Sequence, residues 1–550
     1  MNRKLALIPL VVLLSFGWSC SKCASGGASR PTQLVPGDTA AVVLLPDLTV
    51  LMGHLEGLLK KFSVGPVATF LTQAQLTLNR NLGFDPLKPE EWRKLGIDPA
   101  RGLALAVDAG GVAVVAIGLA DVKVFETEVQ KRLRDLAAAD QVSSASVQGV
   151  AVTTVAAKDL ATPSGERLIP RLHYTVAGRF ALLTAGGNDP KVLVRAASLK
   201  DAETIEAAPW FSGLLAKSSK DADLLVVLNG PKAAERLPLV PQSLIGHLKD
   251  GLSLSISLSP TGIGLRLFLG IDAETGAKLS GLQEGVADAH LENRLPEDTV
   301  LALKGRVNAG RLLDLVLSLD PATRTRYEAE MNQAKQALGM DIQAGTLGNL
   351  AGSGVLGISL GRVENLRQAF SSGLEEDAAT AIRLLLWIQL KDGPAFAQVL
   401  QKALALGPFQ RLSPTQSTAG SLQVVQLRTP KNVELRLLSA GDLLGLCLGS
   451  DCEQAASQLA AGGKPSLADR LSPEAKRLFD SPSILTGILR FETIAQAVAG
   501  LDAGALGDGG LMVKMVLDLV ATALRNIREL TGAIQFLPEG VALEGRLHIQ

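Results

Sequence analysis

The stretch VAVVAIGLADVKVFETEVQKRL at residues 112–133 decides the fold, because it encodes a strand, a helix cap and a helix in succession. Its apolar start has the length and composition of a buried strand. Asp121 follows where a helix N-cap belongs, and its carboxylate can accept hydrogen bonds from free backbone N–H groups. Phe125, Val129 and Leu133 then recur at every fourth position, which places one apolar stripe on a helix that packs against a sheet.

A second stretch with this pattern, RLLLWIQLKDGPAFAQVLQKAL, lies at residues 383–404. Asp392 occupies the cap position, and Phe396 begins the same stripe. Three further pairs of segments follow in the same order: a Pro-containing turn, an Ala-Gly hairpin and a final alternating strand, at 35–39 with 295–299, 177–186 with 440–449, and 259–271 with 537–549. Ordered matches at an offset of about 260 residues predict an internal duplication.

These features predict an α+β fold with an internal duplication, two copies of a mostly antiparallel sheet covered by helices. We expect the first repeat at residues 36–272 and the second at 295–550. The polar stretch at 273–294 is then the connection between them.

The first residues have the composition of an export signal, which we place at 1–19. Arg3 and Lys4 precede an apolar run that is too short to span a bilayer. The sequence Gly-Trp-Ser-Cys at 17–20 resembles the lipobox of bacterial lipoproteins, in which the cysteine is lipidated and becomes the mature N-terminus. Gly17 and Trp18 depart from that pattern, and cleavage after Ala28 is the alternative. We expect a lipid on Cys20, with residues 20–35 forming the anchor cysteine and a flexible linker.

The order of features resembles an uncharacterised family of bacterial domains of unknown function that occur in secreted or membrane-anchored proteins. The resemblance rests on Pro-Gly-Asp-Thr at 36–39, on the Leu-Gly-x-Asp segments at 82–85 and 338–341, and on the Ala-Gly hairpins. It covers most of the chain after the linker. The family has no established activity, so the resemblance implies only the architecture and export. With the lipid on Cys20, we expect a protein of the cell envelope that is anchored to the outer membrane and faces the periplasm or the surface.

The composition and the motifs argue against several classes of function. Lys plus Arg equals Asp plus Glu at 54 each, so the basic surplus typical of nucleic-acid-binding proteins is missing, and we expect no nucleic-acid partner. The Gly-x-Gly-x-x-Gly at 352–357 precedes a strand instead of a helix, so we expect no cofactor. We identify no catalytic residues.

Histidine and cysteine give two candidate sites. Asp288, His290 and Glu292 would share one face of an extended segment, but they lie in the polar connection, so we favour a solvated loop and predict no metal site. Cys447 and Cys452 follow a strand and open a helix. In an oxidising compartment they form either a disulfide or two free thiols, and the sequence leaves both open.

Three segments have no counterpart in the other repeat: residues 86–102 with Trp92, the charged helix at 321–339 and the amphipathic helix at 511–530. From all these features we predict a non-enzymatic cell-envelope lipoprotein with a binding or scaffolding role, anchored in a membrane by its N-terminal lipid and contacting a protein partner or an apolar ligand. The alternatives are a carrier of a lipid or other apolar ligand, and an envelope hydrolase without a recognisable motif.

Overall fold

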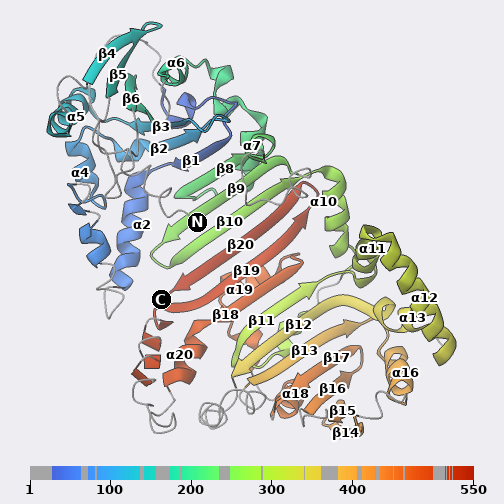
Figure 1. Ribbon diagram of the computed structural model, residues 1–550. Helices are drawn as coiled ribbons and strands as arrows, with labels where there is room; N and C mark the ends of the chain where they lie inside the picture. Colours follow the sequence, from blue (N-terminus) through green and yellow to red (C-terminus); the bar gives the residue numbers. More distant parts are fainter. Residues whose placement is uncertain are drawn as a thin grey trace. The chain divides into compact units, whose positions relative to one another are not determined.

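The computed structural model divides the chain into two compact units, Met1–Asp272 and Ala273–Gln550 (Figure 1). Each unit is described by itself. The residues that the structure describes are 28–62, 72–77, 79–80, 83–136, 142–155, 172–185, 189–234, 248–286, 289–339, 341–360, 382–405, 412–428, 434–449, 451–462, 465–499, 514–515, 517–518, 521–522 and 524–550.

The strands of unit 1 follow one another in space in the order β4, β5, β6, β7, β3, β2, β1, β8, β9, β10, and every neighbouring pair is antiparallel. Their bounds are β1 (Ala41–Leu45), β2 (Leu103–Val107), β3 (Ala113–Gly118), β4 (Val142–Val147), β5 (Val150–Val155), β6 (Leu172–Ala177), β7 (Phe180–Ala185), β8 (Leu224–Asn229), β9 (Leu248–Ser259) and β10 (Gly262–Ile271).

The helices of unit 1 enclose a core against these strands. They are α2 (Leu48–Lys61), α4 (Pro89–Lys94), α5 (Val122–Leu136), α6 (Lys191–Ala197), α7 (Pro209–Lys217) and α8 (Gly230–Ala234). One core cluster joins Trp92 of α4 and Phe125 of α5 to Tyr174 of β6. Trp92 packs edge-on against Phe84, with ring centroids 5.2 Å apart. The segment at 86–102 is therefore part of the core.

The strands of unit 2 are ordered β14, β15, β16, β17, β13, β12, β11, β18, β19, β20, again with antiparallel neighbours. Their bounds are β11 (Thr299–Arg306), β12 (Leu350–Leu360), β13 (Ile382–Leu390), β14 (Thr415–Ala419), β15 (Leu422–Arg428), β16 (Glu434–Ala440), β17 (Leu443–Leu448), β18 (Leu485–Arg490), β19 (Ile527–Leu537) and β20 (Gly540–Ile549).

The helices of unit 2 are α10 (Ala273–Ser280), α11 (Ala309–Leu319), α12 (Pro321–Leu338), α13 (Ile342–Gly345), α16 (Gly393–Leu404), α18 (Cys452–Ala460), α19 (Pro473–Asp480) and α20 (Phe491–Ala499), with short 3-10 turns η7 (Leu291–Arg294) and η9 (Leu467–Asp469). Helix α12 confirms the charged helix predicted at 321–339. The helix predicted at 511–530 is wrong at its end, because residues 527–530 begin strand β19.

The predicted fold class is wrong in its architecture. We expected an internal duplication, two copies of a mostly antiparallel sheet covered by helices, whereas hydrogen bonding assigns the strands of the described residues to one 20-stranded sheet. The physical reason is that alternation in a sequence identifies the buried face of a strand but does not identify the strand that pairs with its edge. The expected combination of helices with antiparallel strands agrees with the structure.

Most of the local predictions for residues 112–133 and 383–404 are confirmed. The carboxylate of Asp121 accepts a hydrogen bond from the backbone N–H of Val124 at 3.0 Å, and that of Asp392 accepts one from Ala395 at 2.9 Å. Phe125 is buried, as predicted. Phe396 is only half-buried, so the core position predicted for it is wrong.

Candidate binding face and ligand cluster

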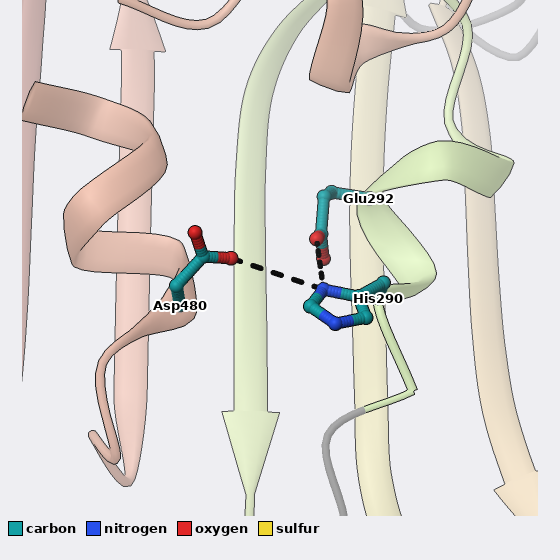
Figure 2. Close-up of side chains that lie close together, drawn as sticks. All are labelled: His290, Glu292 and Asp480. Atoms are coloured by element: carbon teal, nitrogen blue, oxygen red, sulfur yellow. Dashed lines mark hydrogen bonds and ion pairs between the residues drawn. The ribbon is translucent and has the colours of Figure 1, made fainter. Parts of the chain in front are cut away.

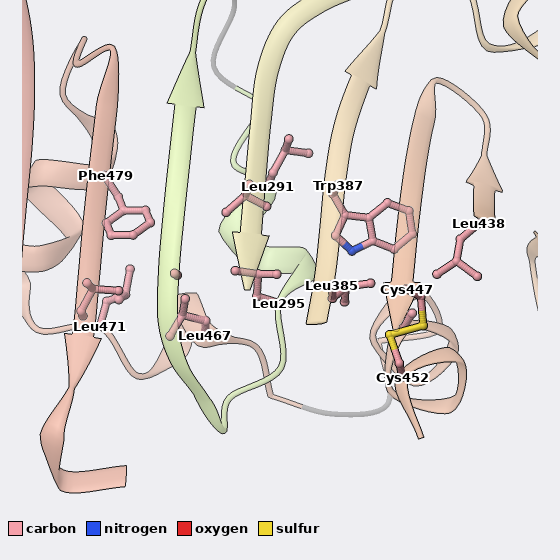
Figure 3. Close-up of a cluster of buried hydrophobic side chains, with 14 of the residues drawn as sticks. Leu291, Leu295, Leu385, Trp387, Leu438, Cys447, Cys452, Leu467, Leu471 and Phe479 are labelled. Carbon is pink, nitrogen blue, oxygen red and sulfur yellow. A yellow bond between two sulfur atoms is a disulfide. The ribbon is translucent and has the colours of Figure 1, made fainter. Parts of the chain in front are cut away.

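The two faces of the unit 2 sheet differ in what covers them. The core cluster takes its sheet residues from one face, among them Ala302, Val355, Trp387 and Ile488, and packs them against Phe479 and other residues of η7, η9, α18 and α19 (Figure 3). We call this face the covered face. Along each strand, the residues that alternate with these core residues point to the opposite side of the sheet.

We call that opposite side the open face. Cross-strand pairs fix its membership, since Leu301 lies opposite both Ile358 and Leu489. Its aliphatic side chains are Leu301, Leu303, Leu356, Ile358, Ile382, Leu384, Leu386, Leu485, Leu489, Leu530, Ile534, Leu543 and Leu547.

None of these open-face side chains is buried. Most are half-buried, and Ile382, Leu485 and Leu530 are exposed by 40%, 38% and 42%. Burying aliphatic surface is worth roughly 25 cal/mol per Å², so these partly exposed side chains retain apolar surface that a ligand or partner could cover.

Glycines interrupt the open face along one line across three strands. Gly487 of β18 lies opposite Gly532 of β19, which lies opposite Gly545 of β20. A Cβ atom added at Gly532 or Gly545 would meet only a backbone oxygen of the neighbouring strand, at 3.4 and 3.8 Å, and no side chain of the described residues within 4 Å. At Gly487, by contrast, an added Cβ atom would lie 3.0 Å from Cδ2 of Leu303.

Aliphatic rows border the glycine line on both sides. Leu489, Leu530 and Leu547 form one row, because each lies opposite the next. Leu485, Ile534 and Leu543 form the other row in the same way. We call this line of three glycines, with the aliphatic rows beside it, the glycine furrow. Its walls are four residues apart along each strand, about 13 Å between backbones, and its floor crosses three strands, about 10 Å.

The covered face carries polar groups where alternation in the sequence would place apolar ones. Lys304 is 1% exposed, and its Nζ lies 3.1 Å from Oε2 of Glu292, which is 5% exposed. Lys304 also donates a hydrogen bond to the carbonyl of Phe479 at 2.9 Å. The buried charges are thus paired, which a low-dielectric interior requires.

Strands β9 and β10 of unit 1 show a similar inversion. Ser253 and Ser255 are buried, whereas Leu252 and Leu254 between them are half-buried. The hydroxyl of Ser255 accepts a hydrogen bond from the backbone N–H of Ser219, which follows α7. The helix therefore lies on the serine side, and the leucines face away from it.

A second feature of unit 2 is a cluster of three potential metal ligands, His290, Glu292 and Asp480 (Figure 2). Glu292 belongs to η7, His290 immediately precedes it, and Asp480 ends α19. The Nδ1 atom of His290 lies 3.3 Å from Oε1 of Glu292 and 3.8 Å from Oδ1 of Asp480. His290 adopts a left-handed backbone conformation, with φ of 44°.

A cavity of about 190 Å³ adjoins this cluster and is lined in addition by Asp469, Lys476 and Phe479. The backbone N–H and the hydroxyl of Ser466 donate hydrogen bonds to Asp469, which hold the pKa of that carboxyl below its ordinary value. Asp469 therefore keeps its negative charge and contributes it to the rim of the cavity.

The sequence identified only part of this cluster. His290 and Glu292 do lie close together, but Asp288, the third residue proposed from sequence, lies outside the described residues. Asp480 was missed because it is distant in the chain. No local spacing relates a helix end to a turn that precedes a different strand, so only the tertiary fold brings them together.

The structure also describes two of the other segments singled out from sequence. Cys447 and Cys452 are buried and joined in a disulfide (Figure 3). The Gly-x-Gly-x-x-Gly segment lies in strand β12, as its strand placement predicted. Cys20, with the rest of the signal and anchor segment, lies outside the described residues. Within the described residues, no helix has the length and apolar content needed to cross a membrane.

Comparisons with known proteins add little. No family model matches the chain, and no curated protein matches it. One solved structure, titled "Structure of crystal form III of TP0453", shares 10% sequence identity with a TM-score of 0.24, over 44% of this chain and 80% of its own length. A similarity at that level supports no conclusion about fold or function.

Proposed function

We propose that the protein is an exported lipoprotein, held at a membrane by a lipid on Cys20, that binds acyl chains of a lipid molecule on the open face of unit 2. The observation that carries this proposal is the glycine furrow, an apolar channel with a backbone floor at Gly532 and Gly545. Its role is binding, without a chemical step.

The furrow fits an acyl chain in shape and in chemistry. Its two walls consist of leucine and isoleucine, and a floor without side chains lets a slender ligand approach the backbone closely. Leu303 leans over Gly487 and so limits the channel at one end. Apolar pockets of this kind bind chiefly by removing apolar surface from water.

The N-terminus supports a lipid as the ligand. If Cys20 carries the anchor, seven residues lie between it and Ala28, where the described chain begins. At ~3.3–3.6 Å per residue, such a tether spans roughly 30 Å at most. Membrane lipids are then the apolar molecules at highest local concentration around the protein.

The disulfide between Cys447 and Cys452 supports export. Disulfides persist in oxidising compartments such as the bacterial envelope and are rare in the cytosol. An export signal and a disulfide are independent features of the chain, and both favour the cell envelope.

The test is binding of a fluorescent fatty acid, cis-parinaric acid, by the chain from Ser21 onward. The variant Gly532→Leu fills the furrow with a side chain on the open face, and we expect it to weaken binding at least tenfold. The matched control is Gly53→Leu on α2, where an added Cβ has nothing within 4 Å. The control should bind as the parent does.

Two outcomes would contradict the proposal. One is failure of the parent chain to bind the probe, and the other is binding of the probe by Gly532→Leu as tightly as by the parent. Flotation with phosphatidylcholine vesicles distinguishes the sources of acyl chains. If the parent chain floats with the vesicles but does not bind the probe, and Gly532→Leu floats equally well, the open face contacts the bilayer surface. That result would overturn the binding of single lipid molecules.

A further inference from the structure

Two carboxylates converge on one imidazole nitrogen in the cluster of His290, Glu292 and Asp480 (Figure 2). Nδ1 of a histidine holds at most one proton, so it can donate a hydrogen bond to only one of the two oxygens. The separations of 3.3 and 3.8 Å exceed the ~2.7–2.9 Å of a charge-assisted hydrogen bond. The Nδ1 atom therefore makes one long hydrogen bond, to Glu292, and one ion-pair contact, to Asp480.

The same separations suit a bound cation. Zinc binds nitrogen and oxygen ligands at about 2.0–2.1 Å, and tetrahedral angles then place neighbouring ligand atoms about 3.3 Å apart. All three ligand atoms lie within 4.8 Å of one another. Asp480, at the end of α19 and 58% exposed, has the freedom to move its carboxylate closer to the other two ligands.

The surrounding charges also favour a cation. Lys304 pairs with Oε2 of Glu292 and leaves Oε1 directed toward His290. This buried lysine fixes the orientation of the carboxylate, as an outer partner of a metal ligand does. Three carboxylates, those of Glu292, Asp480 and Asp469, adjoin the cavity, against the two ammonium groups of Lys304 and Lys476. These five groups carry one more negative than positive charge, and Arg470, whose charge also acts on Asp469, pairs with Glu297.

We propose that His290 Nδ1, Glu292 Oε1 and Asp480 Oδ1 bind a divalent transition-metal ion, zinc by its preference for nitrogen and oxygen donors. Water from the adjoining cavity of about 190 Å³ supplies the fourth ligand. The ion connects η7 to the end of α19 within unit 2. This site is independent of the open face and of lipid binding.

The test is calorimetric titration with zinc chloride of the chain carrying Cys20→Ala and Cys23→Ala, so that N-terminal thiols do not bind the ion. We expect one equivalent to bind, and Asp480→Asn and His290→Gln each to weaken binding at least tenfold. The matched control is His54→Gln, since Nδ1 of His54 faces a single carboxylate, that of Asp223, at 3.0 Å. This control should bind as the parent does.

Cobalt keeps the proposal testable should a variant fail to fold. One equivalent of Co²⁺ added to the same parent chain should give the visible absorption of a tetrahedral nitrogen and oxygen site. The absence of stoichiometric zinc binding, the absence of that absorption, or zinc affinity that neither Asp480→Asn nor His290→Gln reduces would each overturn the site.

Discussion

His548 lies among polar groups on the covered face of unit 2. It faces Glu529 across β19 and β20, and its Nε2 lies 3.4 Å from the hydroxyl of Thr531. Glu529 in turn accepts a hydrogen bond from the hydroxyl of Ser472. Burial lowers the pKa of His548 below its ordinary value, because the charged imidazolium is poorly solvated there, although the negative charge of Glu529 opposes the shift.

This shift makes stability depend on pH. The folded protein holds His548 neutral at a pH where the unfolded chain already takes up a proton, so stability is fully present above the unfolded pKa of about 6.5 and is lost as pH falls from there toward the folded value. We expect the urea midpoint to be lower at pH 5.5 than at pH 7.5, and His548→Gln to reduce that difference. His54→Gln serves as the control. An unchanged difference in His548→Gln would contradict the assignment.

At the scale of elements, helices α5 and α16 begin with the same cap but pack differently. Phe125 belongs to a core cluster with Trp92 and Tyr174, whereas Phe396 is half-buried. The sequence stripe is the same in both helices. Packing against the neighbouring elements therefore decides how much of each ring is removed from water.

The two phenylalanines provide a matched pair of substitutions. We expect Phe125→Ala to destabilise the protein by about 3–5 kcal/mol, the cost of emptying a buried aromatic site. Phe396→Ala should cost roughly 1–2 kcal/mol, because a half-buried side chain loses less apolar burial. Denaturant unfolding of both variants measures the difference. Equal costs would show that the two helices pack alike.

The elements that local chemistry specifies could be predicted from the sequence. Asp121 and Asp392 cap their helices, and Gly178 and Gly441 have the positive φ expected at their hairpin turns. The helix predicted at 511–530 fails at residues 527–530, where Ile527 and Leu530 keep a helical interval of three residues although the backbone is a strand. Only pairing with β18 and β20 decides in favour of the strand.

At the scale of the whole molecule, the alternation of apolar and polar residues in the sequence does not show which face of the sheet the helices cover. The Leu-Ser alternation in β9 shows that its two faces differ, but helices cover the serine side, contrary to the usual preference for burying leucine. The position of the covering helices is set by the whole fold. For the same reason the glycine furrow could not be predicted, since Gly487, Gly532 and Gly545 align only once the register of three strands is known.

The proposed location of the molecule depends on Cys20, which ends a short apolar segment and precedes a linker. We expect Cys20→Ala to lose the lipid and to shift the protein from the membrane fraction to the soluble fraction, or to leave it with its signal segment uncleaved. Cys23→Ala is the matched control, because Cys23 lies three residues further on in the same linker, and its variant should fractionate as the parent does. Fractionation and intact-mass measurement decide the question.

A Cys20→Ala protein that remains on membranes at the mass of a cleaved chain, with no lipid detected on Cys20 of the parent, would show that the anchor lies elsewhere. In that case membrane lipids would no longer be concentrated around the glycine furrow by a tether, and acyl-chain binding would rest on the furrow alone.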